Sequence, residues 1–189
     1  TGTAIKPIIT NINSCSENGT KALEYNLFNN ANINRQTDDV LYFSFGLDSV
    51  VSAYITYDHA YKKSKTNGYL FINPFIDDCE GRWTYLNSIS EDILASVNGR
   101  DSINPFVPTS CTQWKKDSLN ITQFQGQNNL LLRLNIAFSF PTYLDTTHKC
   151  IQNLYFDNIC IHKRYRIIAF ENPTGYGNVT YSSGNGVYD

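Results

Sequence analysis

Apolar and polar side chains alternate along much of the chain, most clearly in Leu130–Phe140. Six large apolar residues occupy alternate positions of this segment, with Arg133, Asn135 and Ser139 between them. A period of two residues is typical of a β-strand with one buried and one solvated face. Val51–Asp58 repeats the pattern. The alternation therefore predicts long strands that each contribute one face to a core.

Shorter segments with the same character predict six further strands. These are Val40–Phe45, Tyr69–Asn73, Trp83–Asn87, Trp114–Leu119, Asn153–His162 and Tyr165–Phe170. Asn67-Gly68 and Asn98-Gly99 are turn dipeptides, each suited to closing a hairpin. Ser90–Val97 is the candidate helix, with Ser90 as its N-cap and acidic residues in its first turn. A strand through Ile93–Val97 is equally consistent with the pattern.

This succession of strands predicts an all-β fold, a two-sheet antiparallel β-sandwich of the jelly-roll type. The 189 residues fit one domain. We expect residues 1–14 to form a lead-in, residues 15–170 the sandwich, and residues 171–189 a Gly-, Asn- and Tyr-rich tail or linker. The chain opens on Thr1 and contains no Met, which suggests a processed or excised piece of a longer protein.

The amino-acid composition argues against several classes of function. Fifteen Lys and Arg stand against 17 Asp and Glu, so the net charge is −2 and no chain-wide basic surface for nucleic acid is expected. No stretch of 18 apolar residues occurs, which argues against membrane insertion. The 13 Tyr residues and a charged fraction of only 17% favour an extracellular or cell-surface β protein.

The five cysteines form no CxxC pair, so a zinc ribbon or a thioredoxin-type site is not expected. An odd number leaves at least one thiol unpaired within the chain or joined to another molecule. Cys150 and Cys160 would close a short loop, and Cys79 and Cys111 are the other plausible partners. The alternative is that several are buried as small apolar residues.

Familiar catalytic motifs are missing: the sequence has no HExxH, GxSxG, Walker or GxGxxG pattern. The histidines, His59, His148 and His162, are isolated in sequence, with no Cys or carboxylate at ligand spacing. A hydrolase built on acidic pairs such as Asp77-Asp78 ranks last among the hypotheses, since adjacent carboxylates in turns are usually solvated. We therefore expect no enzyme and assign no catalytic residue.

Two kinds of binding chemistry remain. Loops rich in Asp and Asn supply the oxygen ligands that Ca²⁺ prefers, with Asp39, Asp157 and Asn158 as the first candidates. Sugar binding needs exposed ring faces near amides and carboxylates. The candidates for such a ligand platform are Trp83, Tyr85, Trp114 and Tyr54. The alternative for these aromatics is burial in the core of the sandwich.

Six segments occur in an order that resembles the jelly-roll modules of secreted bacterial surface proteins exported by the type IX route. That family includes the cleaved-adhesin domains of gingipains and the MAM-like modules of secreted metallopeptidases. The segments are Asp39–Leu41, Ile55–Tyr61, Asp78–Trp83, Phe106–Trp114, Ile121–Gln127 and Asn153–Ile159. The family's opening Asp-x-Leu and closing Asn-x-Leu-Tyr-apolar-Asp-Asn-Ile patterns match the first and last of them.

The resemblance implies a non-catalytic module of a larger secreted or cell-surface protein, which binds a glycan or a cell-surface protein and carries structural calcium. It makes Asp157 the first calcium ligand, Asp39 the second, and Glu17 a further one from the N-terminal strand. The alternative hypothesis is an assembly module of a surface fibre or appendage, which would self-associate with neighbouring subunits.

Overall fold

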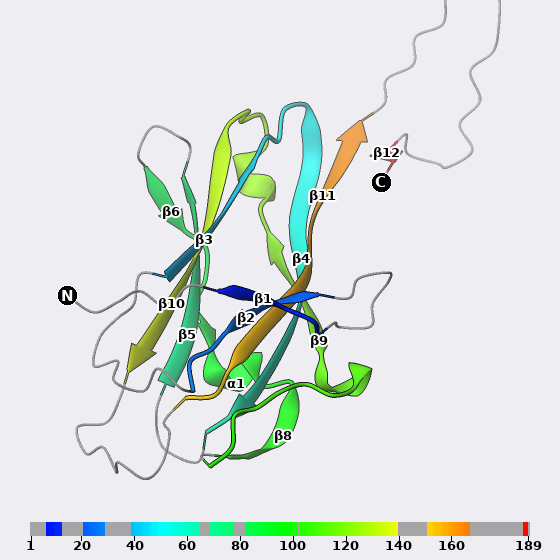
Figure 1. The fold of residues 1–189 in the computed structure, drawn as a ribbon. Coiled ribbons are helices and arrows are strands. Elements are labelled where there is room, and N and C mark those ends of the chain that lie inside the picture. The colour runs from blue at the N-terminus through cyan, green and yellow to red at the C-terminus, as the bar shows by residue number, and fades with distance from the viewer. Residues whose placement is uncertain are drawn as a thin grey trace, which may run out of the picture.

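In the computed structural model, two β-sheets pack face to face (Figure 1). The structure describes residues 7–12, 21–28, 39–64, 69–77, 82–101, 103–139, 151–166 and 187–188. In the seven-stranded sheet the strands are β1 (Ile8–Thr10), β2 (Ala22–Tyr25), β11 (Leu154–Arg166), β4 (Val50–Lys63) and β8 (Val97–Arg100), with β9 (Lys115–Asn120) on β4 and β12 (Val187–Tyr188) on β11. In the five-stranded sheet they are β3 (Asp39–Phe45), β10 (Leu130–Ser139), β5 (Tyr69–Asp77) and β6 (Trp83–Tyr85), with β7 (Ile89–Ser90) on β5.

Successive long strands alternate between the two sheets. The chain passes from β3 in one sheet to β4 in the other, returns to β5, and repeats the crossing through β9, β10 and β11. Such crossings join the halves of a jelly roll. Apart from the parallel pair β4–β8, neighbouring strands in the described residues run antiparallel. The predicted all-β, two-sheet antiparallel sandwich is therefore confirmed.

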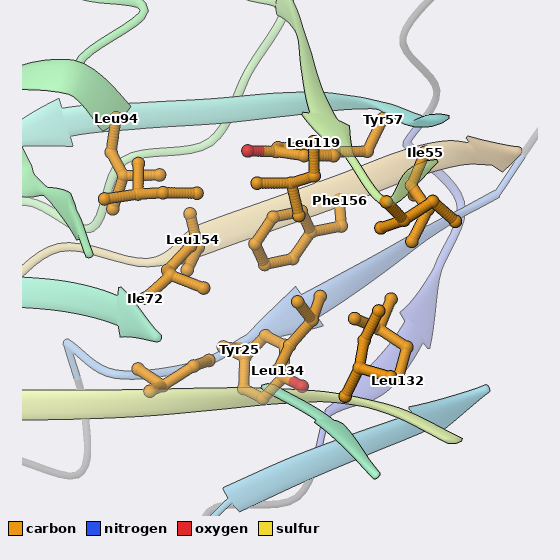
Figure 2. Close-up of a cluster of buried hydrophobic side chains, with 14 of the residues drawn as sticks. Tyr25, Ile55, Tyr57, Ile72, Leu94, Leu119, Leu132, Leu134, Leu154 and Phe156 are labelled. Carbon is orange, nitrogen blue, oxygen red and sulfur yellow. The ribbon is translucent and has the colours of Figure 1, made fainter. Parts of the chain in front are cut away.

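The core lies between the sheets, where the predicted apolar positions meet (Figure 2). Leu132 and Leu134 project from β10 toward Phe156 of β11 and Tyr57 of β4. The rings of Tyr25 and Tyr57 meet the Phe156 ring edge-on, with centroids 6.2 and 5.9 Å away. Fully burying one such side chain contributes about 1.5–3 kcal/mol. Burial of the alternating apolar side chains between the two sheets thus provides the main stabilisation of the sandwich.

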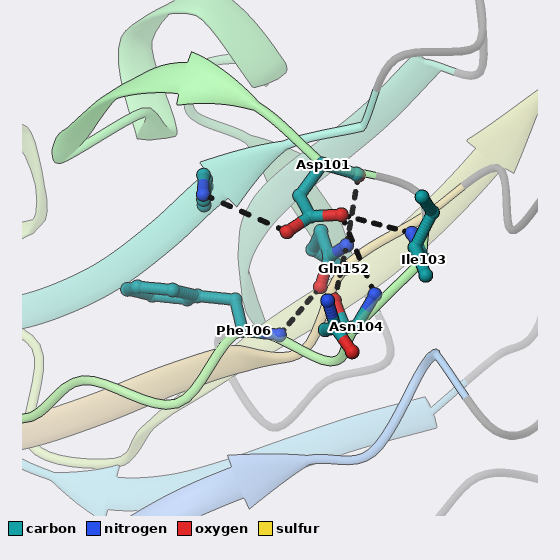
Figure 3. A network of polar contacts seen from close by, with 6 residues as sticks. Asp101, Ile103, Asn104, Phe106 and Gln152 are labelled. Carbon is teal, nitrogen blue, oxygen red and sulfur yellow. Dashed lines mark hydrogen bonds and ion pairs between the residues drawn. The ribbon is translucent and has the colours of Figure 1, made fainter.

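A second, smaller cluster covers the outward side of β4 and β11. The loop that follows β8 packs Phe106 against the buried Tyr155, whose hydroxyl donates to the Phe106 carbonyl at 3.0 Å. The buried amide of Gln152 holds the same loop (Figure 3). Its Nε2 donates to the carbonyls of Asp101 and Asn104, at 2.9 and 3.1 Å, and its Oε1 accepts from the Phe106 N–H at 2.6 Å.

Both hairpin predictions are wrong. Asn67-Gly68 lies outside the described residues, but the strands on either side of it, β4 and β5, belong to different sheets. Asn98-Gly99 lies inside β8, which pairs with β4 in parallel, and Gly99 has φ of +88°. A turn dipeptide fixes local backbone conformation, whereas the sheet that each strand joins is decided by packing far away in the sequence.

Other boundaries differ in detail. The helix predicted over Ser90–Val97 is a single turn, α1 (Glu91–Leu94), and two 3₁₀ turns occur at Cys111–Gln113 and Thr122–Phe124. The two strands predicted after residue 153 are one continuous strand, β11. Within the predicted tail, β12 pairs with the end of β11. No helix among the described residues is long and apolar enough to cross a membrane.

The cysteines correct one prediction. Cys111 is disulfide-bonded, and Cys160 is a free, exposed thiol on β11. A Cys150–Cys160 bridge is therefore wrong. Cys15, Cys79 and Cys150 lie outside the described residues.

Candidate functional site

The outward side of the five-stranded sheet gathers aromatic, charged and amide side chains. Residues directly opposite each other on neighbouring strands share a face of the sheet, and the alternate residues of β5 and β10 are buried in the core. The outward residues form three cross-strand rows: Arg133–Phe75–Tyr85, Leu131–Asp77–Trp83 and Asn135–Asn73. We call these eight residues the aromatic face.

Contacts between rings and a guanidinium hold the aromatic face in place. The Phe75 and Tyr85 rings lie 5.4 Å apart at an interplanar angle of 56°. The Arg133 Cζ atom lies 5.9 Å from the centre of the Phe75 ring and 5.4 Å from that of Trp83. These separations fall within the range of cation–π attraction. Arg133 thus joins the two aromatic rows.

Two rings of this face remain open to solvent. Trp83 is 38% exposed and Tyr85 is 50% exposed, and both project from β6 on the same side. Large aromatics left this accessible, and held in place by neighbours, are typical of binding surfaces. Beside them lie the amide of Asn73 and the guanidinium of Arg133, whose Nε is buried, as is Oδ1 of Asn135.

The fold does not bring the four predicted glycan-binding aromatic residues together on one surface. Trp83 and Tyr85 lie side by side on β6. Tyr54 lies on the other sheet, where its ring stacks on His162 at 4.6 Å and 9°. Trp114 is partly buried in the loop cluster, edge-on to the Tyr155 ring at 6.4 Å. The structure therefore offers one surface built around two of the four.

The predicted calcium ligands are also separated. Asp157, on β11, lies opposite Asp58 of β4, and its Oδ1 accepts from the Asn158 N–H at 2.8 Å. The Asn158 amide donates to Asp58 Oδ2 at 2.9 Å, at a bulge where Asn158 has φ of +47°. Asp39 belongs to β3 in the five-stranded sheet. Its side chain and all of Glu17 lie outside the described part of the chain.

No group of three or more His, Cys, Asp or Glu residues suited to a metal occurs among the residues that the structure describes. Calcium binding stays a prediction.

A buried polar pair lies on the inward side of β4, beside the edge strand β9. His59 is fully buried, and its ring centre is 5.8 Å from that of Tyr57. Burial lowers the pKa of His59 to about 4, against a smaller upward influence from the charge of Asp117. Burial, aided by Asp117, raises the pKa of Tyr57. Both groups are therefore neutral at pH 7 and face the core rather than a ligand.

Phe75 was not among the predicted site residues. The predicted strand Tyr69–Asn73 stops just before Pro74, which cannot donate to a β ladder. In the structure β5 continues through Pro74 to Asp77, which places Phe75 between Arg133 and Tyr85. Alternation beyond the proline is the one sequence signal that points to the continuation.

Comparisons with known proteins found only distant likenesses to solved structures. No family model and no curated protein matches the sequence. A solved structure from a study of promiscuous specificity in carbohydrate-binding modules of the β-sandwich superfamily is 10% identical, with a TM-score of 0.46. The match covers 82% of this chain and 52% of that one.

A second solved structure is the N-terminal endo-1,4-β-D-xylanase 10B of Clostridium thermocellum, comprising its CBM22-1 and GH10 modules with xylohexaose. It is 13% identical with a TM-score of 0.43, and the match covers 88% of this chain and 26% of that one. This chain thus spans about half of the first structure and a quarter of the second. With TM-scores below 0.5 these likenesses carry no argument, so function is argued below from the aromatic face.

Proposed function

We propose that this chain is a non-catalytic carbohydrate-binding module that holds a glycan on its aromatic face. The observation that supports this proposal most directly is that Trp83 and Tyr85 are exposed on one side of a single strand, beside Arg133. Residues two apart in a strand are separated by roughly 7 Å. A glycan chain laid along β6 therefore places sugar rings on both side chains.

The remaining residues of the face suit the polar part of a sugar. The apolar C–H face of a pyranose packs on an aromatic ring, which removes apolar area from water. Its hydroxyls then need donors and acceptors. The terminal nitrogens of Arg133 are the N–H donors, since its Nε is buried, and the Asn73 amide supplies both a donor and an acceptor. The face has a single carboxylate, Asp77, whereas glycoside hydrolysis ordinarily uses two carboxylates flanking the scissile bond.

An open sheet face buries less of a ligand than a deep pocket does. Its affinity is correspondingly limited once the cost of association is subtracted. We expect a Kd between about 1 µM and 1 mM for an oligosaccharide of several sugars. Single sugars bind more weakly because they cover one ring only.

A glycan array followed by calorimetry tests the proposal. Array hits are titrated against the wild type, Trp83→Ala and Tyr85→Ala, and each substitution is expected to weaken binding at least about tenfold. Tyr165→Ala is the matched control, because Tyr165 is 43% exposed but lies on β11 of the other sheet. Equal binding by all four proteins, or no hit with a folded sample, would contradict the proposal.

We also propose that the module works outside the cell, in a secreted or cell-surface protein, with a glycan-bearing surface as its partner. The disulfide at Cys111 supports this, because structural disulfides persist mainly in oxidising compartments. The second candidate is an assembly module. It is favoured by Ile8 and Ile9 of the edge strand β1, which are 52% and 70% exposed. Analytical ultracentrifugation separates the two, since only the assembly module self-associates.

A further inference from the structure

A polar pocket lies away from the aromatic face, between α1 and β8. Its volume is about 390 Å³, within the range of sites that hold small molecules. Its lining residues are Lys63, Asp92, Ala95, Val97, Asn98, Gly99 and Arg100. Lys63 ends β4, Asp92 lies in α1, Ala95 follows α1 and the other four lie in β8, and none belongs to the aromatic face.

A bulge shapes one wall of this pocket. Lys62 of β4 pairs with Val97, yet the next residue, Lys63, pairs with Arg100. The two residues between Val97 and Arg100 are therefore left outside the ladder, and Gly99 takes φ of +88°. Space around Gly99 is open, with no heavy atom within 4 Å of where a Cβ would lie. Bulges of this kind often re-aim side chains next to functional sites.

Hydrogen bonds fix both ends of the bulged segment. Before it, the Ser96 hydroxyl donates to the Gln113 carbonyl at 2.6 Å and accepts from the Tyr61 N–H at 3.0 Å. After it, the Asp101 N–H donates to the Lys63 carbonyl at 3.0 Å. Gln152 in turn holds the Asp101 carbonyl (Figure 3). The pocket is thus preformed, because its walls are tied to β4 and to the buried loop cluster.

The charges around the pocket are unequal. Lys63 forms an ion pair with Asp92, so these two largely neutralise each other. Glu91 does not line the pocket, and its Oε1 accepts from the Tyr61 hydroxyl at 3.1 Å. Arg100 is exposed, and no carboxylate of the described residues lies within ion-pair distance of it. The charge of Arg100 opposes the burial-driven rise in the pKa of Glu91, but its guanidinium forms no ion pair within the described residues and is left to receive an anion.

We propose that this pocket is a second ligand site, which binds a monosaccharide-sized acidic sugar such as a hexuronate. Arg100 receives the carboxylate, for which its planar fork of N–H donors is suited. The Asn98 amide and the Asp92 carboxylate receive hydroxyls, as donor and acceptor. A simple carboxylate lacks the hydroxyls, and a neutral sugar lacks the charge. Of these three ligand types, the acidic sugar alone uses both sets of groups.

Titration of the ¹⁵N-labelled protein with D-galacturonate, D-galactose and acetate tests this site by NMR. Galacturonate is expected to shift the amide signals of Asn98 and Gly99 with saturation, and to bind at least about tenfold more tightly than galactose or acetate. Raising the salt from about 50 mM to about 500 mM should weaken the binding. Equal affinity for galactose, or equal affinity for acetate, overturns the acidic-sugar assignment.

Variants separate this site from the aromatic face. Arg100→Gln is expected to weaken galacturonate binding at least about tenfold. Arg166→Gln, an exposed arginine on β11, should leave it unchanged, and so should Trp83→Ala. Loss of galacturonate binding in Trp83→Ala, or its persistence in Arg100→Gln, overturns the pocket. The proposal does not depend on the aromatic face, since failure of the oligosaccharide titrations leaves these expectations intact.

Discussion

The guanidinium carbon of Arg133 on β10 lies 5.4 Å from the centre of the Trp83 ring on β6, although β5 separates these strands. The long arginine side chain reaches across the intervening strand and passes the Phe75 ring on the way. Two residues 50 positions apart in the sequence therefore share one rigid surface. This contact orients the indole while leaving part of it open to a ligand.

Arg133→Met should weaken oligosaccharide binding about fivefold, which corresponds to about 1 kcal/mol. Methionine keeps much of the apolar stem but loses the cation–π attraction and the donors. Arg133→Lys should retain part of the affinity, because it keeps the charge without the planar fork. Calorimetry with an array hit measures both, with Arg166→Met as the control. Wild-type affinity in Arg133→Met, together with a loss in Trp83→Ala, would show that the guanidinium takes no part.

Gln152→Ala should destabilise the fold by about 2–4 kcal/mol, because three backbone groups of the loop after β8 lose their partner in a buried setting. Urea denaturation followed by fluorescence measures the free energy of unfolding. Gln123→Ala, at an exposed glutamine, is the control. A Gln152→Ala variant within about 0.5 kcal/mol of that control would mean that the loop is held by its apolar contacts alone.

The faces of the strands could be predicted from the sequence, but their neighbours could not. Alternation in Leu130–Ser139 is a local signal, and it correctly assigns Leu132 and Leu134 to the core and Arg133 to the outer side. The rows of the aromatic face depend instead on register between β10, β5 and β6, which is set by non-local packing. Trp83 and Tyr85 were found from residue type, whereas Arg133 was not named as part of the site.

No feature of the sequence predicted the pocket between α1 and β8. It depends on a parallel pairing between β4 and β8 and on a bulge that leaves out two residues. The dipeptide Asn98-Gly99 predicted a turn, and Gly99 does adopt the left-handed backbone that such a turn uses. Its surroundings differ because β8 adds to an existing strand instead of folding back on itself.

His59 should make the fold sensitive to acid. Its pKa is about 4 in the folded state and about 6.5 when unfolded, so between these values the unfolded chain binds the proton and the folded chain does not. Its contribution to stability is complete above about pH 6.5 and is lost as the pH falls toward 4. The loss amounts to about 3 kcal/mol, since each unit of pKa difference is worth about 1.4 kcal/mol.

Urea denaturation at pH 7, 5.5 and 4 measures this loss, with His59→Leu as the test variant. The variant should lose about 3 kcal/mol less than the wild type between the extremes. His162→Gln is the control: it changes a partly exposed histidine that contacts Thr56, and it should keep the acid-dependent loss. An identical pH profile for His59→Leu and wild type would place the acid sensitivity in the carboxylates instead.

We expect calcium to bind at the Asp157 carboxylate. This carboxylate lies directly opposite Asp58, which is only 4% exposed, and like charges in that relation repel. Lys116 lies opposite Asp58 on its other side and offsets part of the repulsion. A divalent cation beside Asp157 offsets more of it and adds oxygen ligands from the bulge at Asn158. Binding to the folded state alone stabilises it by about 2.7 kcal/mol at a free calcium concentration of 100 Kd.

Thermal unfolding in calcium and in chelator tests this prediction. The wild-type Tm should rise with calcium and return to its starting value with chelator. Asp157→Asn should lose the rise, yet in chelator it should melt close to the wild type, because the amide keeps an acceptor for the Asn158 N–H and removes the repulsion from Asp58. Asp48→Asn, in an exposed turn, should behave as the wild type does. A full calcium response in Asp157→Asn would move the site elsewhere, and no response in the wild type would remove calcium from the description of this module.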